Sequence, residues 1–306
     1  MGYALRTFSI SKKYKGHMAV DGATMNVSEG DIYGFVGENG SGKTTIIRLV
    51  TGLIFPDEGD FELFGVKSTD PGITSARKQL GAIVETPSIY RNMSAKENLR
   101  LQCELLGIPA DKEKIRATLL SVGLDPDISE KKHAGDFSLG MRQRLGIAMA
   151  LLGEPRMIIL DEPMNGLDPA GIVEVRELIL QLNRERGITF LISSHILTEL
   201  ALVATKYGII SKGRVIREIT AEELHRECAK HVSLQVDDVS ALDALLKEQF
   251  AENPREISGD TVKVMGDVDL NRLLPLVLAA GIVLKSVNCT EMSFEEYYLS
   301  LLGGKK

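Results

Sequence analysis

The clearest chemistry in this chain lies in a glycine-rich run that ends in lysine and threonine. The run fits the phosphate-binding pattern GxxxxGK[ST] and reads Gly37-Glu38-Asn39-Gly40-Ser41-Gly42-Lys43-Thr44. In such a loop, glycines let backbone N–H groups approach phosphates, and the dipole of the following helix adds positive potential. We expect Lys43 to reach the β- and γ-phosphates of a nucleoside triphosphate and the Thr44 hydroxyl to ligate Mg²⁺, and we count Thr45 among the nucleotide-binding residues.

Two adjacent acids, Asp161 and Glu162, supply the other half of such a site. They follow the apolar run Met157-Ile158-Ile159-Leu160, at the point where a buried strand should end. We expect Asp161 to hold the Mg²⁺ shell, and Glu162 to lie nearer the γ-phosphate, where it would orient and polarise the attacking water. His195 follows another apolar run, and at a strand end of an α/β sheet it is a candidate for a γ-phosphate contact.

A second anion site is predicted at Ser138 and Gly140. Both lie at the N-terminus of a helix expected to run to Leu152, and exposed amides at such a terminus attract phosphate. One nucleotide does not need two phosphate sites in one chain. Two copies arranged head to tail could instead place this helix against the γ-phosphate of the partner.

The elements around these residues predict an α/β fold. Short strands with continuous apolar runs are expected at 32–36, 157–160 and 188–192, and such runs suit a sheet covered on both faces by helices. Further strands are expected at 3–10, 19–27, 61–65 and 82–84. Helices are expected at 95–106, 111–122 and 140–152, the first opened by the capping box Ser94-Ala95-Lys96-Glu97. We therefore predict a nucleotide-binding domain over 1–220 with a helical subdomain at about 86–153.

The C-terminal part, 221–306, is predicted to form a separate small α+β domain. Strands are expected at 232–236, 261–265 and 282–287, with helices at 241–250 and 270–280. With a hairpin at Ser258-Gly259-Asp260, the order is β-α-β-β-α-β, which favours a ferredoxin-like domain. A last helix, capped by Ser293, is expected to run to Leu302. This part holds no cluster of chemically active residues, so docking, dimerisation and regulation all stay open.

Composition excludes several classes of protein. The net charge of −6 and a pI near 5.5 argue against a dedicated nucleic-acid binder, which usually carries a basic patch. The longest apolar run, 273–284, is shorter than the ~20 residues that span a bilayer. The N-terminus has no apolar signal core, and the cysteines are scattered in the pattern of reduced thiols, at Cys103, Cys228 and Cys289. We expect a soluble cytoplasmic protein that binds no nucleic acid.

Over about residues 4–220, the chain resembles the ATP-binding subunits of ABC transporters, whose motifs it carries in the expected order. The loop at Gly37 is similar to the Walker A motif, and Ile158–Asp161 is similar to the Walker B motif. The catalytic glutamate, the D-loop, the switch histidine and the signature motif correspond to Glu162, Asn165-Gly166-Leu167-Asp168, His195 and Phe137-Ser138-Leu139-Gly140-Met141. Tyr14 lies where the family places an aromatic ring that stacks on adenine.

The signature motif departs from the usual LSGGQ. Leu139 replaces the first glycine and Met141 replaces the glutamine, whereas Ser138 and Gly140, which are most directly tied to phosphate contact, remain.

The usual Q-loop glutamine is also replaced, by Glu85. A carboxylate is a stronger and harder Mg²⁺ ligand than an amide, so we count Glu85 with Thr44 and Asp161 as a metal ligand. We hypothesise that Glu85 alters metal dependence and coupling to the membrane partner. Both departures, and the tail 292–301, resemble the bacitracin- and lantibiotic-type exporters of bacteria.

The resemblance implies an ATPase that uses ATP and Mg²⁺ to drive the export of an antimicrobial peptide or antibiotic. Two subunits would sandwich two ATP molecules, each held by Walker A of one chain and by Ser138, Gly140 and Asp168 of the other. This implies a head-to-tail dimer, and a homodimer is favoured over a pair with a relative. The pore would be a separate transmembrane permease subunit that meets segment 85–93 and holds the protein at the inner face of the cell membrane.

Two alternatives stay open. The membrane subunit selects the cargo, so a transporter for lipid, polysaccharide or sodium fits the same motifs. A pore-less ABC ATPase that acts on ribosomes or DNA fits less well, because the chain has one cassette, an acidic balance and neither a long coiled coil nor a zinc module.

Overall fold

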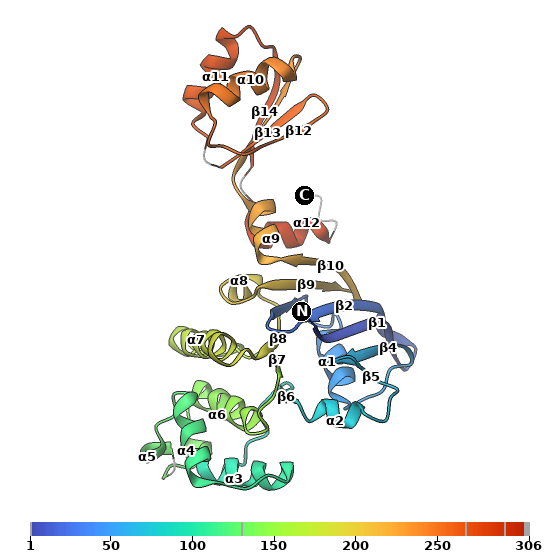
Figure 1. The fold of residues 1–306 in the computed structure, drawn as a ribbon, viewed down its shortest axis with the longest axis vertical. Coiled ribbons are helices and arrows are strands. Elements are labelled where there is room, and N and C mark those ends of the chain that lie inside the picture. Colours follow the sequence, from blue (N-terminus) through green and yellow to red (C-terminus); the bar gives the residue numbers. More distant parts are fainter. Residues whose placement is uncertain (1, 130, 267, 291, 303–306) are drawn as a thin grey trace. The chain divides into compact units, whose positions relative to one another are not determined.

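The computed structural model describes residues 2–129, 131–266, 268–290 and 292–302. The chain divides into two compact units, Met1–Ala221 and Glu222–Lys306, and each has its own hydrophobic core. Figure 1 shows the elements of both units in chain order. Within the described ranges, no helix is both long enough and apolar enough to cross a membrane.

A six-stranded sheet lies at the centre of the first unit, in the order β10-β9-β3-β8-β7-β6. The strands are β3 (Ile32–Val36), β6 (Leu80–Ile83), β7 (Met157–Asp161), β8 (Thr189–Ser194), β9 (Lys206–Ser211) and β10 (Arg214–Thr220). All neighbours pair parallel except β10, which is antiparallel to β9. Every residue of β3, β7 and β8 is buried, as their apolar runs predict. The carboxyl ends of these three neighbouring strands therefore lie together.

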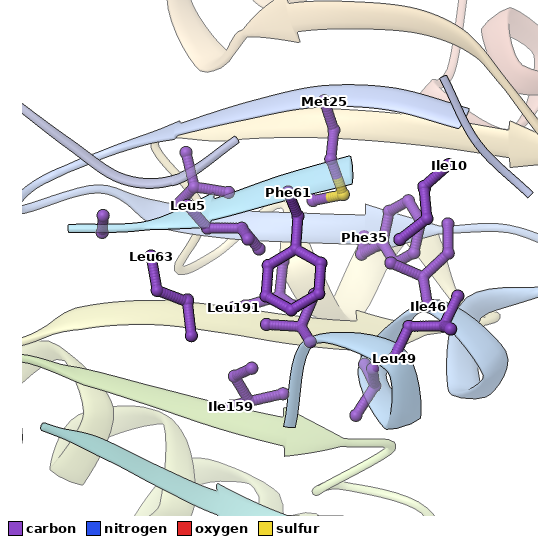
Figure 2. Packing of buried hydrophobic residues seen from close by; sticks show 14 of the residues in the cluster. Leu5, Ile10, Met25, Phe35, Ile46, Leu49, Phe61, Leu63, Ile159 and Leu191 are labelled. Carbon is purple, nitrogen blue, oxygen red and sulfur yellow. The ribbon is translucent and has the colours of Figure 1, made fainter. Parts of the chain in front are cut away.

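A second, antiparallel sheet of the same unit has the order β2-β1-β4-β5. Its strands are β1 (Tyr3–Tyr14), β2 (His17–Ser28), β4 (Glu58–Leu63) and β5 (Val66–Lys67). Figure 2 shows Met25 and Phe61 of this sheet near Leu191 of the central sheet, with Leu49 of helix α1 (Lys43–Thr51) in the same cluster. Helix α1 thus contributes to the core shared by the two sheets, which fixes the loop that precedes it.

The remaining helices of the first unit lie in the sequence between β5 and β9. They are α2 (Ile73–Arg77), α3 (Ala95–Leu106), α4 (Lys112–Ser121), α5 (Pro126–Ser129), the 3₁₀ turn η1 (Ala134–Asp136), α6 (Leu139–Leu151), α7 (Pro169–Arg186) and α8 (Leu197–Leu200). The helices expected between 95 and 152 are confirmed as α3, α4 and α6. The capping box is also confirmed, because the Ser94 and Glu97 side chains each accept a hydrogen bond from the backbone of the other.

The second unit has the β-α-β-β-α-β order expected from the sequence. Its elements are β11 (His231–Val236), α10 (Val239–Gln249), β12 (Arg255–Ser258), β13 (Thr261–Met265), α11 (Leu270–Ala279) and β14 (Leu284–Thr290), flanked by α9 (Ala221–Cys228) and α12 (Phe294–Leu301). The sheet order is β12-β13-β11-β14, and every neighbouring pair is antiparallel. This is the arrangement of a split β-α-β, ferredoxin-like sheet.

The last strand of this unit begins later than the sequence suggested. Gly281 has φ 71°, and the Ile282 amide donates to the Val277 carbonyl at 3.3 Å, so Ile282 still belongs to the cap of α11. The strand instead continues through polar residues to Thr290, which pairs with His231 of β11. Pairing with a neighbour, rather than apolar composition, determines where this strand ends.

Candidate active site

The loop at residues 37–42 joins β3 to α1 and requires glycine for physical reasons. Gly40 and Gly42 have φ of 81° and 111°, in the left-handed region that side chains disfavour. A Cβ at Gly37 would lie 2.5 Å from the Ile210 carbonyl oxygen and from Ser41 Oγ, and one at Gly42 would lie 2.6 Å from the Ala19 carbonyl oxygen. Helix α1 has no side-chain cap at Gly42, so its first amides stay available to an anion.

Lys43 and Ser41 provide the polar groups inside this loop. Lys43 is 5% exposed, and its Nζ donates to the carbonyls of Gly37 at 2.6 Å and Glu38 at 3.2 Å. Ser41 Oγ is buried and has no hydrogen-bond partner among the described residues. A buried hydroxyl without a partner costs free energy, so Ser41 fits a loop built to meet a polar ligand such as a phosphate. Asn39 and Gly40 lie exposed at the loop tip, and Thr45 is half-buried behind it.

Thr44, Asp161 and Ser193 form a hydrogen-bonded chain across three elements. Thr44 Oγ1 donates to Asp161 Oδ2 at 2.9 Å, which joins α1 to β7. Ser193 Oγ on β8 donates to Asp161 Oδ1 at 2.6 Å and accepts from the Glu162 amide at 2.9 Å. Sequence reasoning missed Ser193. The sequence feature that could have identified it is a serine directly after the apolar run Phe190-Leu191-Ile192. In a strand buried on both faces, a hydroxyl needs a hydrogen-bond partner on a neighbouring element.

Glu162 lies between a cation and an imidazole. Its Oε1 is 3.4 Å from Lys43 Nζ, and its Oε2 is 2.6 Å from His195 Nδ1. Glu162 also has φ 51°, which is unusual for a residue with a side chain and is typical of functional sites. The structure therefore brings Lys43, Glu162 and His195 together at the ends of β3, β7 and β8. A carboxylate held in this way can accept a proton from water.

The helix N-terminus at which a second anion site is predicted packs against the N-terminus of α7. Ser138 caps α6 by accepting from the Met141 amide at 3.1 Å, and Asp168 caps α7 by accepting from the Gly171 amide at 3.0 Å. A Cβ at Gly140 would lie 3.7 Å from Gly171 Cα. Ser138 and Asp168 are exposed at these termini and Gly140 is buried, and among the described residues none of the three hydrogen-bonds to Lys43 or Thr44.

Leu139, which replaces the usual glycine, belongs to the same region. Its Cδ2 lies 3.4 Å from where a Cβ of Gly166 would be, and the side chain is 42% exposed. The leucine therefore packs over the loop before α7 and still reaches solvent.

Tyr14 and Glu85 each lie beside a cation outside the loop at residues 37–42. Tyr14 ends β1, is 39% exposed, and has Lys12 Nζ 5.9 Å from its ring centre. The Glu85 carboxylate pairs with Arg48 of α1 rather than with Thr44. Its assignment as a metal ligand therefore stays a prediction.

Comparison with known proteins identifies the family. The ABC transporter family model matches residues 20–165. The bacitracin transport ATP-binding protein BcrA of Bacillus licheniformis is 40% identical over 306 residues, which cover 99% of this chain and 99% of that protein. BcrA of Enterococcus faecalis is 33% identical over 99% of this chain and 98% of that protein. The lantibiotic transport ATP-binding protein SrtF of Streptococcus pyogenes is 38% identical over 70% of this chain and 90% of that protein.

Solved structures agree with this relationship. An ABC transporter cassette in its ADP conformation matches with a TM-score of 0.65 at 28% identity, over 73% of this chain and 93% of that one. A post-hydrolysis cassette dimer bound to ADP and Pi shares the fold, with a TM-score of 0.64 at 23% identity over 71% and 98% of the two chains. With its phosphate loop, paired acids and full-length relatives, the chain belongs to the ABC transporter family, as an ATP-hydrolysing subunit similar to the bacitracin and lantibiotic transport ATP-binding proteins.

Proposed function

We propose that this chain hydrolyses ATP to power the export of an antimicrobial peptide or peptide antibiotic through a separate membrane permease. The observation that carries the proposal is the hydrogen-bonded network from Thr44 through Asp161 and Ser193 to Glu162, which joins a phosphate loop to a general base. The full-length similarity to a bacitracin transport ATP-binding protein supports the class of cargo.

The nucleotide would bind along the loop and the start of α1. Phosphate oxygens would take over the Lys43 ammonium from the carbonyls of Gly37 and Glu38 and would give Ser41 Oγ a partner. The exposed ring of Tyr14 would stack on the adenine, where its face offers apolar contact.

Thr44 and Asp161 fit a magnesium ion. Hydroxyl and carboxylate oxygens are ligands that Mg²⁺ prefers, and the two side chains already touch. The described residues contain no group of three or more His, Cys, Asp or Glu that could hold a metal by themselves. This agrees with Mg²⁺ sites in which phosphates and water complete the shell. When bound, the ion would supply positive charge that offsets the negative charge developing during phosphoryl transfer.

Glu162 would act as the general base. Its carboxylate is oriented by His195 and lies beside Lys43, so a water between it and the γ-phosphate could give up its proton as it attacks. His195 would hold Glu162 in place and approach the γ-phosphate through the other side of its ring.

A head-to-tail homodimer would complete each site. The N-termini of α6 and α7, which carry Ser138, Gly140 and Asp168, pack together, and Ser138 and Asp168 are exposed there. Against the loop of a second copy, the N-terminus of α6 would supply amides and positive potential to the γ-phosphate. Hydrolysis would then remove the charge that holds the two copies together.

The permease would dock beside the segment that follows β6. A cavity of about 430 Å³ is lined there by Thr86, Pro87 and Ser88 and, on α6, by Gly146 and Met149. A permease seated at this cavity would hold the chain at the inner face of the cell membrane and would sense movement of Glu85.

Glu162→Gln tests the proposal, because the amide keeps the shape of the side chain and removes its basicity. We expect ATP binding to survive and turnover to fall about 10²–10⁴-fold in a phosphate-release assay. Glu154→Gln is the matched control, since Glu154 also has φ 51° and pairs with Lys114 outside the site. Near-normal hydrolysis by Glu162→Gln would refute the role of the carboxylate.

The same variant tests the partner. Tagged Glu162→Gln protein, purified with ATP from gently solubilised native membranes, should retain a multi-span membrane protein detectable by mass spectrometry. Retention of ribosomal proteins or DNA, without a membrane protein, would contradict the exporter assignment.

A further inference from the structure

Glu85 has an ion-pair partner that no sequence motif predicts. Its carboxylate forms an ion pair with the Arg48 guanidinium. Arg48 lies on α1 four residues after Thr44, so the two side chains leave the same face of the helix. Helix α1 therefore carries both the proposed metal ligand Thr44 and the cation that binds Glu85.

The backbone at Glu85 also needs such a restraint. Glu85 has φ 63°, and the Thr86 amide donates to the Val84 carbonyl at 2.9 Å, so residues 84–86 form a γ-turn with positive φ. Turns of this hand are rare and strained for residues with a side chain, and they persist only where their surroundings hold them. The Arg48 ion pair is one contact that holds this turn.

The ion pair is exposed enough to exchange partners. The side chains of Arg48 and Glu85 are 40% and 60% exposed, so water screens their attraction. A carboxylate near a triphosphate would otherwise be repelled, and Arg48 cancels that charge. Mg²⁺ is the stronger competitor for a carboxylate, because its charge is double and its preferred ligands are oxygens.

We propose that Arg48 is a positioning residue that competes with the metal for Glu85 and thereby weakens metal binding in the ATP site. This inference rests on the nucleotide site proposed above. It explains how the chain accommodates a glutamate at a position where the family usually has a neutral glutamine, since glutamine would not form the ion pair with Arg48.

The test measures metal binding rather than turnover. In a Glu162→Gln background, ATP affinity is measured by equilibrium dialysis with Mn²⁺ and with EDTA, and bound Mn²⁺ is counted by electron paramagnetic resonance. The dissociation constant for ATP in EDTA divided by that in Mn²⁺ measures how much the metal strengthens ATP binding. Arg48→Ala should raise this ratio about two- to fivefold, the range expected for loss of an exposed ion pair.

The same substitution must be made in a Glu85→Gln background, where we expect Arg48→Ala to leave the ratio unchanged. Arg48→Lys, which keeps the charge and guards against a folding defect, should give an intermediate rise. Arg77→Ala is the matched control, because Arg77 Nε contacts the Val50 carbonyl at the end of α1 and should leave the ratio unchanged.

Each outcome is decisive. An equal rise with and without Glu85, no rise, or a fall on Arg48→Ala would overturn the competition while leaving the nucleotide site intact. Failure of the parent protein to bind ATP under either condition would overturn the proposed function and this inference with it.

Discussion

Replacing Ser193 with alanine should damage the site more than the loss of one hydroxyl suggests. Ser193 is fully buried, and its Oγ donates to the Asp161 carboxylate at 2.6 Å while accepting from the Glu162 amide at 2.9 Å. A hydrogen bond to a charged group contributes about 1.5–3 kcal/mol. The Glu162 amide keeps a second acceptor, the Ser193 carbonyl at 3.2 Å, so its share of the loss is small. We expect a total of about 2–3 kcal/mol.

Calorimetry should register this loss as a fall of roughly 4–12 °C in the unfolding temperature of the first unit, at about 2–4 °C per kcal/mol. The functional cost is separate. Without Ser193, the Asp161 carboxylate can rotate away from Thr44, and loss of such a supporting hydrogen bond typically weakens metal affinity or activity by about 10–100-fold. A Mg²⁺ titration of ATP hydrolysis measures this second effect.

Ser194→Ala separates the two effects. Ser194 is 4% exposed, and its hydroxyl accepts from the Ile196 amide at 2.9 Å without touching either acid. The Ser194→Ala variant should lose stability and keep the Mg²⁺ dependence of ATP hydrolysis seen in the parent protein. If Ser193→Ala and Ser194→Ala show the same Mg²⁺ dependence, Ser193 has no role in orienting the acids and the reasoning fails.

Two further predictions concern the scaffold. Gly208→Ala should destabilise the first unit by about 1–3 kcal/mol or more, because its Cβ would lie 2.0 Å from Oη of the buried Tyr33. Thermal unfolding measures this against Gly72→Ala, whose Cβ would meet Val66 at an ordinary 3.4 Å; equal losses would contradict the packing argument. In the second unit, hydrogen bonds and charge from Lys247 and then Arg255 lower the pKa of Asp243. A lowered folded-state pKa gives stability that is present above about pH 4 and lost as the pH falls further. Asp243→Asn should therefore flatten the acid side of that unit's stability profile, and an unchanged profile would exclude Asp243 as its source.

Local patterns sufficed wherever a backbone conformation depends only on neighbours in the chain. The glycines of residues 37–42 and the Ser94 capping box need only their own segment, and the structure places both as expected. The β-α-β-β-α-β order of the second unit was likewise readable from alternating apolar runs and one hairpin turn.

Roles that depend on which segments become neighbours could not be read in this way. Ser193 reaches Asp161 because β8 lies beside β7, and the sequence of neither strand predicts that the two are neighbours in the sheet. The Arg48–Glu85 pair likewise requires the chain after β6 to place Glu85 beside α1. The β9–β10 hairpin was overlooked because its two-residue turn, formed by Lys212 and Gly213 with φ of 48° and 81°, has a favoured residue only at the second position.

The left-handed backbone of Glu162 has a consequence for how such a chain changes over generations. A strained backbone of this kind costs about 1–3 kcal/mol, a sizeable part of the 5–15 kcal/mol that separates folded from unfolded protein. Glycine would relieve the strain and abolish the base at the same time. Mutational drift toward stability and selection for turnover therefore pull this position in opposite directions. A gene copy that is no longer selected for ATP turnover should lose the glutamate early, and its folded state should become more stable.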